Sequence, residues 1–437
     1  MKTHVTLIRI ASVVLLVCIV AGGSVDTGSG TAIAIGVTGR ANANASIASS
    51  GSFVGVAWAA RTKDGVTDVY VATSRDGGRS FGVPVRVNQV PGDASVSGEQ
   101  PPRIVLSARG STNPAIVVLW TAKSASGTRL VSARSNDGGK SFGLAESVPG
   151  SDASGNRGWE SAAVTSNGDV VAVWLDHREV PARTAGAAMS GAHQHGATNQ
   201  RPAADGVARA QLSQIVFARL NEPASARAIA PGVCYCCKTS VATGANGTVV
   251  AAWRHVYTGN TRDIALAKSS DGGRTFASPV RVSEDNWVLD GCPENGPAVA
   301  IDQTNAIHVV WPTLVRGSTG AEETLALFYA ASKDGQRFTK RQQIPTEGVP
   351  RHPQIAVEPG GTITVAWDEQ LKGTRRIVVA RRTSDDKNYV GFVRQSVSNE
   401  PGTYPAVVSL ADAAIVAWTS GSTGETVLRV ERHPAVR

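Results

Sequence analysis

A short apolar run that ends in tryptophan occurs seven times along this chain of 437 residues. The tryptophans are Trp58, Trp120, Trp174, Trp253, Trp311, Trp367 and Trp418, and successive ones lie 62, 54, 79, 58, 56 and 51 residues apart. Around most of them lie further short runs, rich in Val, Ile and Ala and separated by Gly, Asn, Asp and Pro. Runs of this kind are typical of β-strands, and no segment shows a sustained helical period.

Four short strands per repeat predict an all-β protein, a β-propeller in which each repeat is one four-stranded antiparallel sheet, or blade. A blade cannot bury both of its faces alone, so we expect the tryptophan runs to pack between neighbouring blades. We expect seven blades, with six as the alternative. The last repeat, from Tyr404, has room for only three strands, and residues 31–37 (TAIAIGV) could supply the fourth and close the ring. The propeller is expected to span residues 31–435.

Residues 1–23 have the layout of a secretory signal peptide. Lys2 and Arg9 form a short basic region, and an uncharged run begins at Ile10. That run is shorter than the ~20 apolar residues that a membrane-spanning helix needs. We therefore expect an exported protein, periplasmic or extracellular, with no membrane span in the mature chain.

The charge of the chain is modest and scattered. The sequence has 43 Lys and Arg against 35 Asp and Glu, and loss of Lys2 and Arg9 with the signal peptide would leave 41 against 35. No run of lysine or arginine stands out, so the composition argues against nucleic acid as a partner. We expect a monomer with a mildly basic surface. Export would also place the cysteines where disulfides persist.

A second motif recurs after several of the tryptophan runs. It reads SRDGGRSF at 74–81, SNDGGKSF at 135–142 and SSDGGRTF at 269–276, with a shortened SKDGQRF at 332–338. An aspartate in such a turn accepts hydrogen bonds from nearby backbone amides, and the glycines supply positive φ angles. The four aspartates are Asp76, Asp137, Asp271 and Asp334, and we expect a structural role for them.

This Ser-x-Asp-Gly-Gly-x-x-Phe motif is the Asp box. Together with the tryptophan repeat, it makes the chain resemble the sialidase-like (neuraminidase, BNR-repeat) propellers over essentially the whole expected mature chain. In that family the Asp box lies on the face away from the active site. Similar boxes occur in glycosidases and in non-catalytic, lectin-like propellers, so the resemblance implies a fold without fixing a function.

In propellers, the ligand face is built by the loops that lead into each first strand and by those that join the second and third strands. Candidate ligand-binding residues in these loops are Arg103, Arg178, Arg254, Arg351 and His352. A sialidase needs an arginine clamp for the substrate carboxylate, a Tyr–Glu pair and an acidic residue as acid/base. The resemblance implies Tyr404 as nucleophile, Glu160 as its base and Asp176 as acid/base.

The sequence also departs from the catalytic pattern of that family. The first repeat has NANASIASS where an Arg-Ile-Pro motif is expected, and we count seven repeats where catalytic sialidases have six blades. We therefore expect an exported propeller that binds an anionic glycan or similar small ligand without full sialidase catalysis and without a required cofactor. The alternative is a glycoside hydrolase of the exo-sialidase type.

The third repeat contains a long insertion, residues 180–211, which accounts for the spacing of 79 residues. It is rich in Ala, Gly and Thr and shows no strand or helix pattern. Long loops of this kind are functional or disordered. The insertion carries His193 and His195, and it can reach the start of the fourth repeat, because the two blades are neighbours.

The start of the fourth repeat reads CYCCKTS and contains Cys234, Cys236 and Cys237, while Cys292 leads into the next blade. A disulfide from Cys292 to this cluster is one interpretation, with a second bridge from Cys234 to a neighbour or a thiol left over. The alternative is a copper(I) or zinc site that combines the thiolates with imidazole from one of four histidines, His193, His195, His177 or His255. The sequence leaves both interpretations open.

Overall fold

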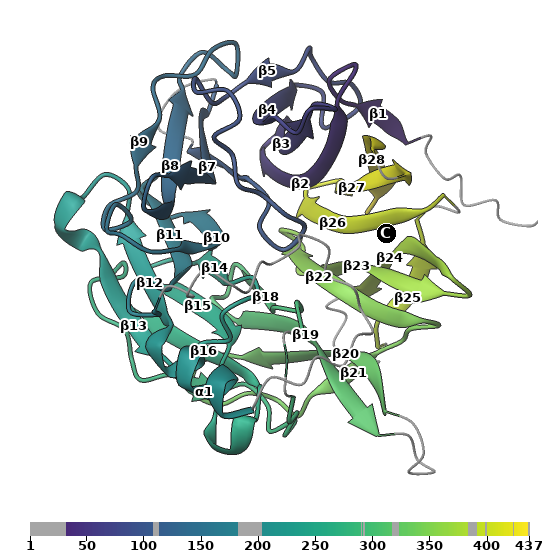
Figure 1. Cartoon of the computed structure of the whole chain (residues 1–437). Coiled ribbons are helices and arrows are strands. Elements are labelled where there is room, and N and C mark those ends of the chain that lie inside the picture. Colours follow the sequence, from purple (N-terminus) through teal and green to yellow (C-terminus); the bar gives the residue numbers. More distant parts are fainter. Residues whose placement is uncertain are drawn as a thin grey trace, which may run out of the picture.

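Seven four-stranded antiparallel sheets follow one another around a ring (Figure 1). The structure is a computed structural model, and it describes residues 32–107, 113–181, 203–289, 291, 293–316, 323–382, 391–397, 400–422 and 424–435. In the first six sheets, the strand that comes first in the chain lies nearest the centre of the ring, and in the seventh sheet β26 takes this place, with β1 at the outer edge (Figure 1). The predicted fold class and the preferred number of blades are both confirmed.

The first blade contains β2 (Ala41–Ser50), β3 (Phe53–Arg61), β4 (Thr67–Ser74) and β5 (Val85–Arg86). The second blade contains β6 (Arg103–Ser107), β7 (Ala115–Ser124), β8 (Gly127–Ser135) and β9 (Glu146–Ser147). The third blade contains β10 (Arg157–Val164), β11 (Val170–Asp176), β12 (Gln214–Arg219) and β13 (Arg227–Pro231). The fourth blade contains β14 (Ser240–Thr243), β15 (Val249–Arg254), β16 (Ile264–Ser269) and β17 (Val280–Arg281). The fifth blade contains β18 (Ala298–Ile301), β19 (Ile307–Arg316), β20 (Glu323–Ser332) and β21 (Gln342–Ile344). The sixth blade contains β22 (Val349–Val357), β23 (Ile363–Leu371), β24 (Thr374–Arg382) and β25 (Val393–Ser396).

The seventh blade is built from both ends of the described chain. It contains β26 (Gly402–Ser409), β27 (Ala413–Ser422) and β28 (Glu425–Pro434), and β1 (Ile33–Ile35) adds the fourth strand. β1 pairs antiparallel with β28, with Ile33 opposite Val430 and Ile35 opposite Leu428. Ring closure by the segment that precedes the first repeat is therefore confirmed.

The seven repeated tryptophans are all fully buried, and each lies on the second strand of its blade. They pack between blades. Trp58 of the first blade belongs to one apolar cluster with Ile415 and Leu428 of the seventh. Trp253 of the fourth blade packs in the same way with Phe217 of the third. Because a buried aromatic side chain removes roughly 150–250 Å² from water, these contacts dominate the packing of blade on blade.

The Asp boxes have the local geometry that the motif predicts. The Oδ1 atom of Asp76 accepts hydrogen bonds from the amides of Arg79 and Ser80, each at 2.9 Å, and the Ser80 hydroxyl donates to Oδ2 at 2.6 Å. The hydroxyls of Ser80 and Ser74 hold the pKa of Asp76 well below its usual range. The carboxylates of Asp137, Asp271 and Asp334 likewise accept hydrogen bonds from their own turns.

The second glycine of the box lies against the preceding blade. Gly273 has a φ of 86°, and a Cβ atom there would lie 2.1 Å from the ring of Phe217. A side chain at this position would clash with its neighbour as well as strain the backbone. The Asp box therefore sets the distance between two blades in addition to shaping its own turn.

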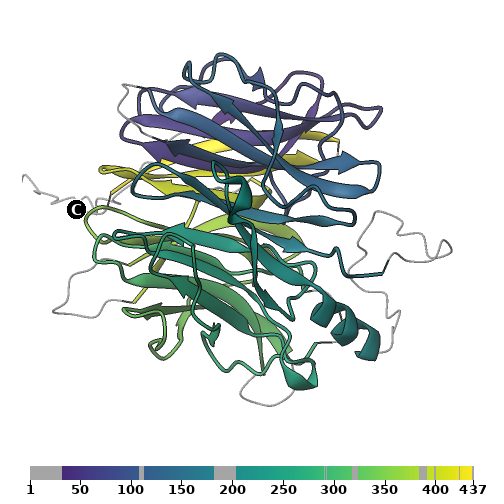
Figure 2. The same ribbon diagram turned by 90° about the vertical axis from the view of Figure 1, so that its left-hand side faces the viewer.

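One expectation about the insertion in the third blade is wrong. Residues Ala203–Leu212 form a helix, α1, where the sequence analysis expected neither strand nor helix. The segment AADGVARAQL is rich in good helix formers, and Val207 and Ala210 pack against the cysteine segment of the fourth blade. The helix lies at the periphery of the ring (Figure 2). His193 and His195 lie outside the described residues, as does the expected signal peptide.

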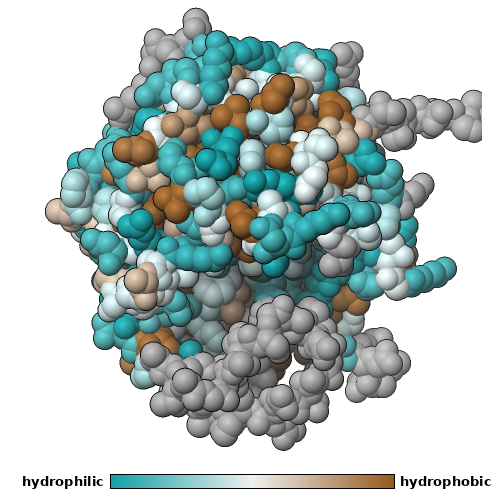
Figure 3. Space-filling model, turned by 45° about the horizontal axis from the view of Figure 1, so that its top comes forward, coloured by the Kyte–Doolittle hydropathy of each residue, from teal (hydrophilic) through white to brown (hydrophobic). Residues whose placement is uncertain are grey.

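The described part of the chain contains no helix with the length and apolar character that crossing a membrane requires. Its helical content is limited to α1 and to short 3-10 turns at Pro223–Ser225 and Thr258–Asn260. Where the surface is visible in Figure 3, hydrophobic side chains are interspersed with hydrophilic ones.

Closure of the ring by β1 generates a stability prediction. Ile35 is buried against the seventh blade, whereas Ala34 on the same strand is exposed. We expect Ile35→Asp to lower the free energy of unfolding of the whole domain by about 3 kcal/mol or more, because it buries an unpaired carboxylate. Ala34→Asp is the matched control and should change it by less than about 0.5 kcal/mol. Equal denaturant unfolding curves for the two variants would contradict closure by β1.

Candidate functional site

Four of the innermost strands carry the same irregularity near their first residues. In β2, β10, β22 and β26 the register shifts by one residue, because two residues of the strand lie opposite one residue of its neighbour. The first of the two bulged residues has a positive φ in each case. These residues are Asn44 (62°), Trp159 (53°), His352 (51°) and Tyr404 (52°). Non-glycine residues with such angles are strained by about 1–3 kcal/mol each, and bulges of this type redirect side chains. The repeated bulge marks this end of the ring as the candidate site.

We call this region the channel mouth and define it by six residues that line a small cavity there: Glu99, Arg103, Lys238, His352, Gln354 and Tyr404. Arg103 comes from the second blade, His352 and Gln354 from the sixth, and Tyr404 from the seventh. Lys238 comes from the loop between β13 and β14, and Glu99 from the loop that joins the first blade to the second, which reaches toward the centre of the ring (Figure 1). The cavity has a volume of about 10 Å³, which is room for about one water molecule. The channel mouth is therefore nearly filled by its own side chains.

A buried carboxylate, Asp368, ties two of the bulges together. Its Oδ1 atom accepts a hydrogen bond from His352 Nδ1 at 2.6 Å and another from the Tyr404 amide at 3.2 Å. A carboxylate can only accept, so His352 carries its proton on Nδ1 and keeps Nε2 as an acceptor when the ring is neutral. The rings of His352 and Tyr404 lie against each other, with centroids 4.1 Å apart.

Tyr404 is held as a neutral phenol. Burial raises its pKa well above the usual range, and the negative charges of Glu99, Asp368 and Glu294 add to the effect. The ring lies directly over Gly98, where a Cβ atom would be 2.0 Å from Tyr404 Cζ. Tyr404 therefore offers a hydrogen-bond donor whose position is fixed by its neighbours.

Glu99 and Lys238 link the loop at the channel mouth to three blades. Glu99 Oε2 accepts hydrogen bonds from the amides of Lys238 (3.2 Å) and Gly296 (3.3 Å). Lys238 is 3% exposed and donates from Nζ to the Pro353 carbonyl at 2.6 Å. Burial lowers the pKa of Lys238 to about 8, although the nearby charge of Glu99 opposes this shift.

Two arginines complete the positive charge of the region. Arg103 donates from Nε to the Glu160 carbonyl at 2.7 Å, and its buried Nη2 has no hydrogen-bond partner among the described residues. Burial lowers the pKa of Arg103. Burial and the charge of Arg375 lower the pKa of Arg351, which directly precedes His352. The groups around Arg103 and Arg351 therefore compensate the positive charges of these two arginines only partly.

The structure places the three residues expected for sialidase catalysis in different settings. Tyr404 lies at the channel mouth, whereas Glu160 is fully buried and accepts a hydrogen bond on Oε2 from the Thr121 hydroxyl at 3.0 Å. The carboxylates whose charges act on Tyr404 are Glu99, Asp368 and Glu294. Among these, Glu99 also lines the cavity, so it takes the position beside Tyr404 that the sequence analysis gave to Glu160.

Asp176 is engaged in ion pairs. Its Oδ2 atom lies 3.2 Å from Arg157 Nε and 2.7 Å from Arg178 Nη2. Burial tends to raise the pKa of Asp176, but the Arg178 hydrogen bond and the Arg157 charge hold it at about 2. A carboxyl group with that pKa is ionised near neutral pH and has no proton to donate as a general acid.

The predicted ligand-binding residues also divide into two groups. Arg103, Arg351 and His352 lie at or beside the channel mouth. Arg254 is fully buried, and each of its three nitrogens donates to backbone carbonyls, those of Arg262, Asn295 and Pro312. It therefore clamps the fourth blade to the fifth, and all three of its nitrogens already donate to backbone carbonyls. Arg178 likewise donates hydrogen bonds from Nη2 to the Asp176 carboxylate and to the Gly150 carbonyl.

A larger cavity of about 500 Å³ lies elsewhere, at the fifth blade. Its lining includes Trp287, Leu314, Asp285 and Arg341. Asp285 and Arg341 form an ion pair, and Asp285 also accepts a hydrogen bond from the Trp311 indole at 2.6 Å. Asp285 and Arg341 therefore compensate each other's charge, whereas the cations of the channel mouth are compensated only partly.

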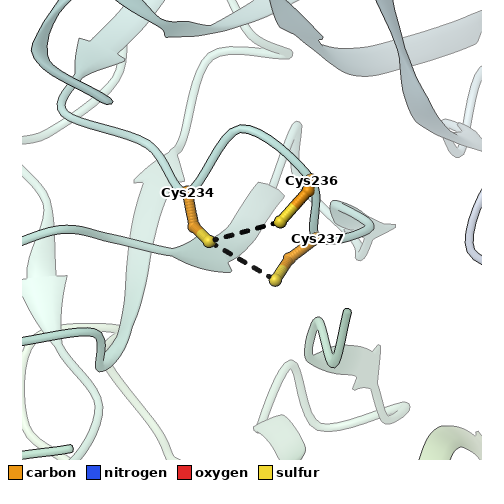
Figure 4. Close-up of side chains that lie close together, drawn as sticks. All are labelled: Cys234, Cys236 and Cys237. Carbon is orange, nitrogen blue, oxygen red and sulfur yellow. Dashed lines mark hydrogen bonds between the residues drawn. The ribbon is translucent and has the colours of Figure 1, made fainter. Parts of the chain in front are cut away.

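The three clustered cysteines lie in the loop between β13 and β14 (Figure 4). Cys234 and Cys237 are free thiols, and Cys236 is disulfide-bonded. The second bridge that the sequence analysis considered for Cys234 is therefore not formed. Cys292 lies outside the described residues, and its pairing with this cluster stays a prediction.

No protein-family model matches the chain, and no curated protein is similar to it in sequence. Among solved structures, it is similar to an ulvan lyase of polysaccharide lyase family PL25, with 9% identity over 92% of this chain and 96% of that chain and a TM-score of 0.54. It is also similar to the α-L-arabinofuranosidase Arb93A from Fusarium graminearum, with 12% identity over 93% and 98% of the two chains and a TM-score of 0.50. At such identities the likeness shows the fold alone, which is a β-propeller.

The contact between Tyr404 and Gly98 generates a prediction about the channel mouth. We expect Gly98→Ala to lower the free energy of unfolding by about 1–3 kcal/mol, because the added methyl group has no room beside the fixed ring. Gly360→Ala is the matched control, since a Cβ atom there meets no other group within 4 Å. Denaturant unfolding measures both variants. Equal stability would show that the ring of Tyr404 is free to move aside.

Proposed function

We propose that this chain is an exported propeller that binds the acidic group of a glycan at the channel mouth, without sialidase-type turnover. The observation that carries the proposal is the set of three partly compensated cations, Arg103, Lys238 and Arg351. Burial lowers the pKa of each of them, so the protein holds their charges at a cost in free energy. An incoming carboxylate or sulfate would remove part of that cost.

The hydrogen-bonding groups at the channel mouth suit the same kind of ligand. Tyr404 is a neutral phenol and can donate to an anionic oxygen, and the buried Nη2 of Arg103 has no partner among the described residues. Charge-assisted hydrogen bonds of this type are roughly twice as strong as neutral ones. The donors therefore favour an anion over a neutral sugar hydroxyl.

The size of the cavity limits what can enter. A space of about 10 Å³ cannot hold a sugar ring, so only the acidic group would enter, displacing a water molecule, while the rest of the glycan stays outside. We choose glycans as the first class of ligand because similar structures include polysaccharide-active proteins, and one ulvan lyase is described as bound to a disaccharide of glucuronate and sulfated rhamnose. Asp176, being ionised, does not support hydrolysis by the expected acid/base.

Calorimetric titration with a glucuronate-containing oligosaccharide, sialyllactose and neutral lactose tests the proposal. We expect one of the acidic ligands to bind and lactose not to bind. Arg351→Gln should weaken binding at least about tenfold, since it removes a charge-assisted hydrogen bond. Arg79→Gln is the matched control, because Arg79 is exposed and lies in an Asp box, away from the channel mouth. Equal effects of the two substitutions would contradict the proposed site.

The pKa of Lys238 generates a second prediction. The amine is charged below a pH of about 8 and neutral above it, so an anion should bind more weakly as the pH rises through this value. We expect affinity to fall about three- to tenfold between pH 7 and pH 9. Lys238→Met should weaken binding at pH 7 and abolish this pH dependence. A pH dependence that persists unchanged in Lys238→Met would show that another group titrates.

The hydrolase alternative keeps one specific observation in its favour, the proximity of Glu99 to Tyr404 in the lining of the cavity at the channel mouth. A fluorogenic sialoside assay with the unmodified chain and with Tyr404→Phe separates the two functions. We expect no turnover by either protein. Turnover that Tyr404→Phe abolishes would overturn the proposal that the propeller only binds.

A further inference from the structure

The cysteine cluster brings three sulfur atoms to one place. The Sγ atoms of Cys234, Cys236 and Cys237 all lie within 4.8 Å of one another (Figure 4). The Sγ of Cys234 is 3.6 Å from that of Cys237 and 3.9 Å from that of Cys236. Two metal–sulfur bonds of about 2.3 Å span up to about 4.6 Å, so one ion can bridge the two free thiols.

The cluster is closed off from solvent and fixed by the backbone. Cys234 and Cys237 are each 1% exposed, and they pack with Ala210 of α1 and Val256. The amide of Cys234 donates to the Arg254 carbonyl at 2.8 Å, which ties the loop to β15. The two free thiols are therefore buried, and the loop that carries them is tied to the fourth blade.

A buried arginine supplies the charge that such a site needs. Arg262 is fully buried and donates from Nη1 to the Cys234 sulfur at 3.2 Å. Its Nε donates to the neutral side chain of Asn260, and its buried Nη2 has no hydrogen-bond partner among the described residues. An anion beside a buried guanidinium lowers the cost of burying its charge, and a thiolate at Cys234 would supply that anion.

We infer that Cys234 and Cys237 form a buried binding site for a soft monovalent metal ion, copper(I). Thiolates select copper(I) and zinc over harder ions. Two thiolates and copper(I) carry a net charge of −1, which the adjacent Arg262 balances. Zinc with the same two thiolates would be neutral, and it normally requires four ligands. In the described part of the chain, no histidine or carboxylate belongs to the group that could supply the remaining two.

The inference is independent of glycan binding, although the two sites are neighbours. Cys237 directly precedes Lys238, whose amide donates to Glu99 at the channel mouth. The disulfide-bonded Cys236 is not a thiolate and is assigned no ligand role. The site therefore differs from the expected combination of thiolates with His193 or His195.

The test is anaerobic titration of the purified protein with copper(I) in competition with a chromophoric copper(I) chelator. We expect one copper(I) ion per chain. Cys234→Ala and Cys237→Ala should each lower the affinity at least 100-fold. The matched control is the double variant Cys236→Ala, Cys292→Ala, which leaves both free thiols in place and should retain the ion. No retained copper in the wild-type protein, or equal loss in the control, would overturn the inference.

A second measurement does not depend on the folding of any variant. X-ray absorption at the copper edge of the loaded wild-type protein should show sulfur ligands only. Nitrogen or oxygen ligands would overturn the assignment to these two thiols. Stoichiometric binding of zinc in a parallel titration, with no retention of copper, would overturn the choice of metal.

Discussion

Each blade of this protein depends on its neighbours, because a single four-stranded sheet of Val, Ala and Trp cannot bury both of its faces. The fully buried tryptophans meet this constraint by packing from one blade onto the next, as Trp58 does with Leu428 across the closure of the ring. The pairing of β1 with β28 adds the fourth strand to the seventh blade and joins the two ends of the described chain in one sheet. The channel mouth exists only because this closed ring holds seven innermost strands side by side.

The positions of the polar groups at the channel mouth depend on the closed ring. Asp368 holds two neighbouring bulges, and Glu99 reaches from a loop to the amides of two further blades. Each interaction joins segments that are far apart in the sequence, so the positions of Tyr404 and Lys238 depend on the whole ring. On a flexible scaffold, the side chains of the buried cations could turn toward water. Water would then compensate their charges, and they would attract an anion less strongly.

The fold was predictable from the sequence because its determinants are local and repeated. The strand pattern, the tryptophan spacing and the Asp boxes each occur several times, and every copy supports the same architecture. The site was harder to predict because its determinants are single and tertiary. The bulges at His352 and Tyr404 turn side chains in directions that alternation along a strand does not give. Glu99 and Lys238 were missed because nothing local distinguishes them, although Lys238 directly follows the conspicuous cysteines. The short helix α1 was missed because its pattern is brief and its stability comes from packing on the next blade.

The central claim is that the channel mouth receives the acidic group of a ligand. A crystal structure of the protein with a glucuronate-containing oligosaccharide tests it most directly. The account predicts carboxylate oxygens within hydrogen-bond distance of Tyr404 and of at least one of Arg103, Lys238 and Arg351, with the sugar rings outside the cavity. An oligosaccharide bound instead in the cavity beside Trp287 and Arg341, with the channel mouth unchanged, would contradict it.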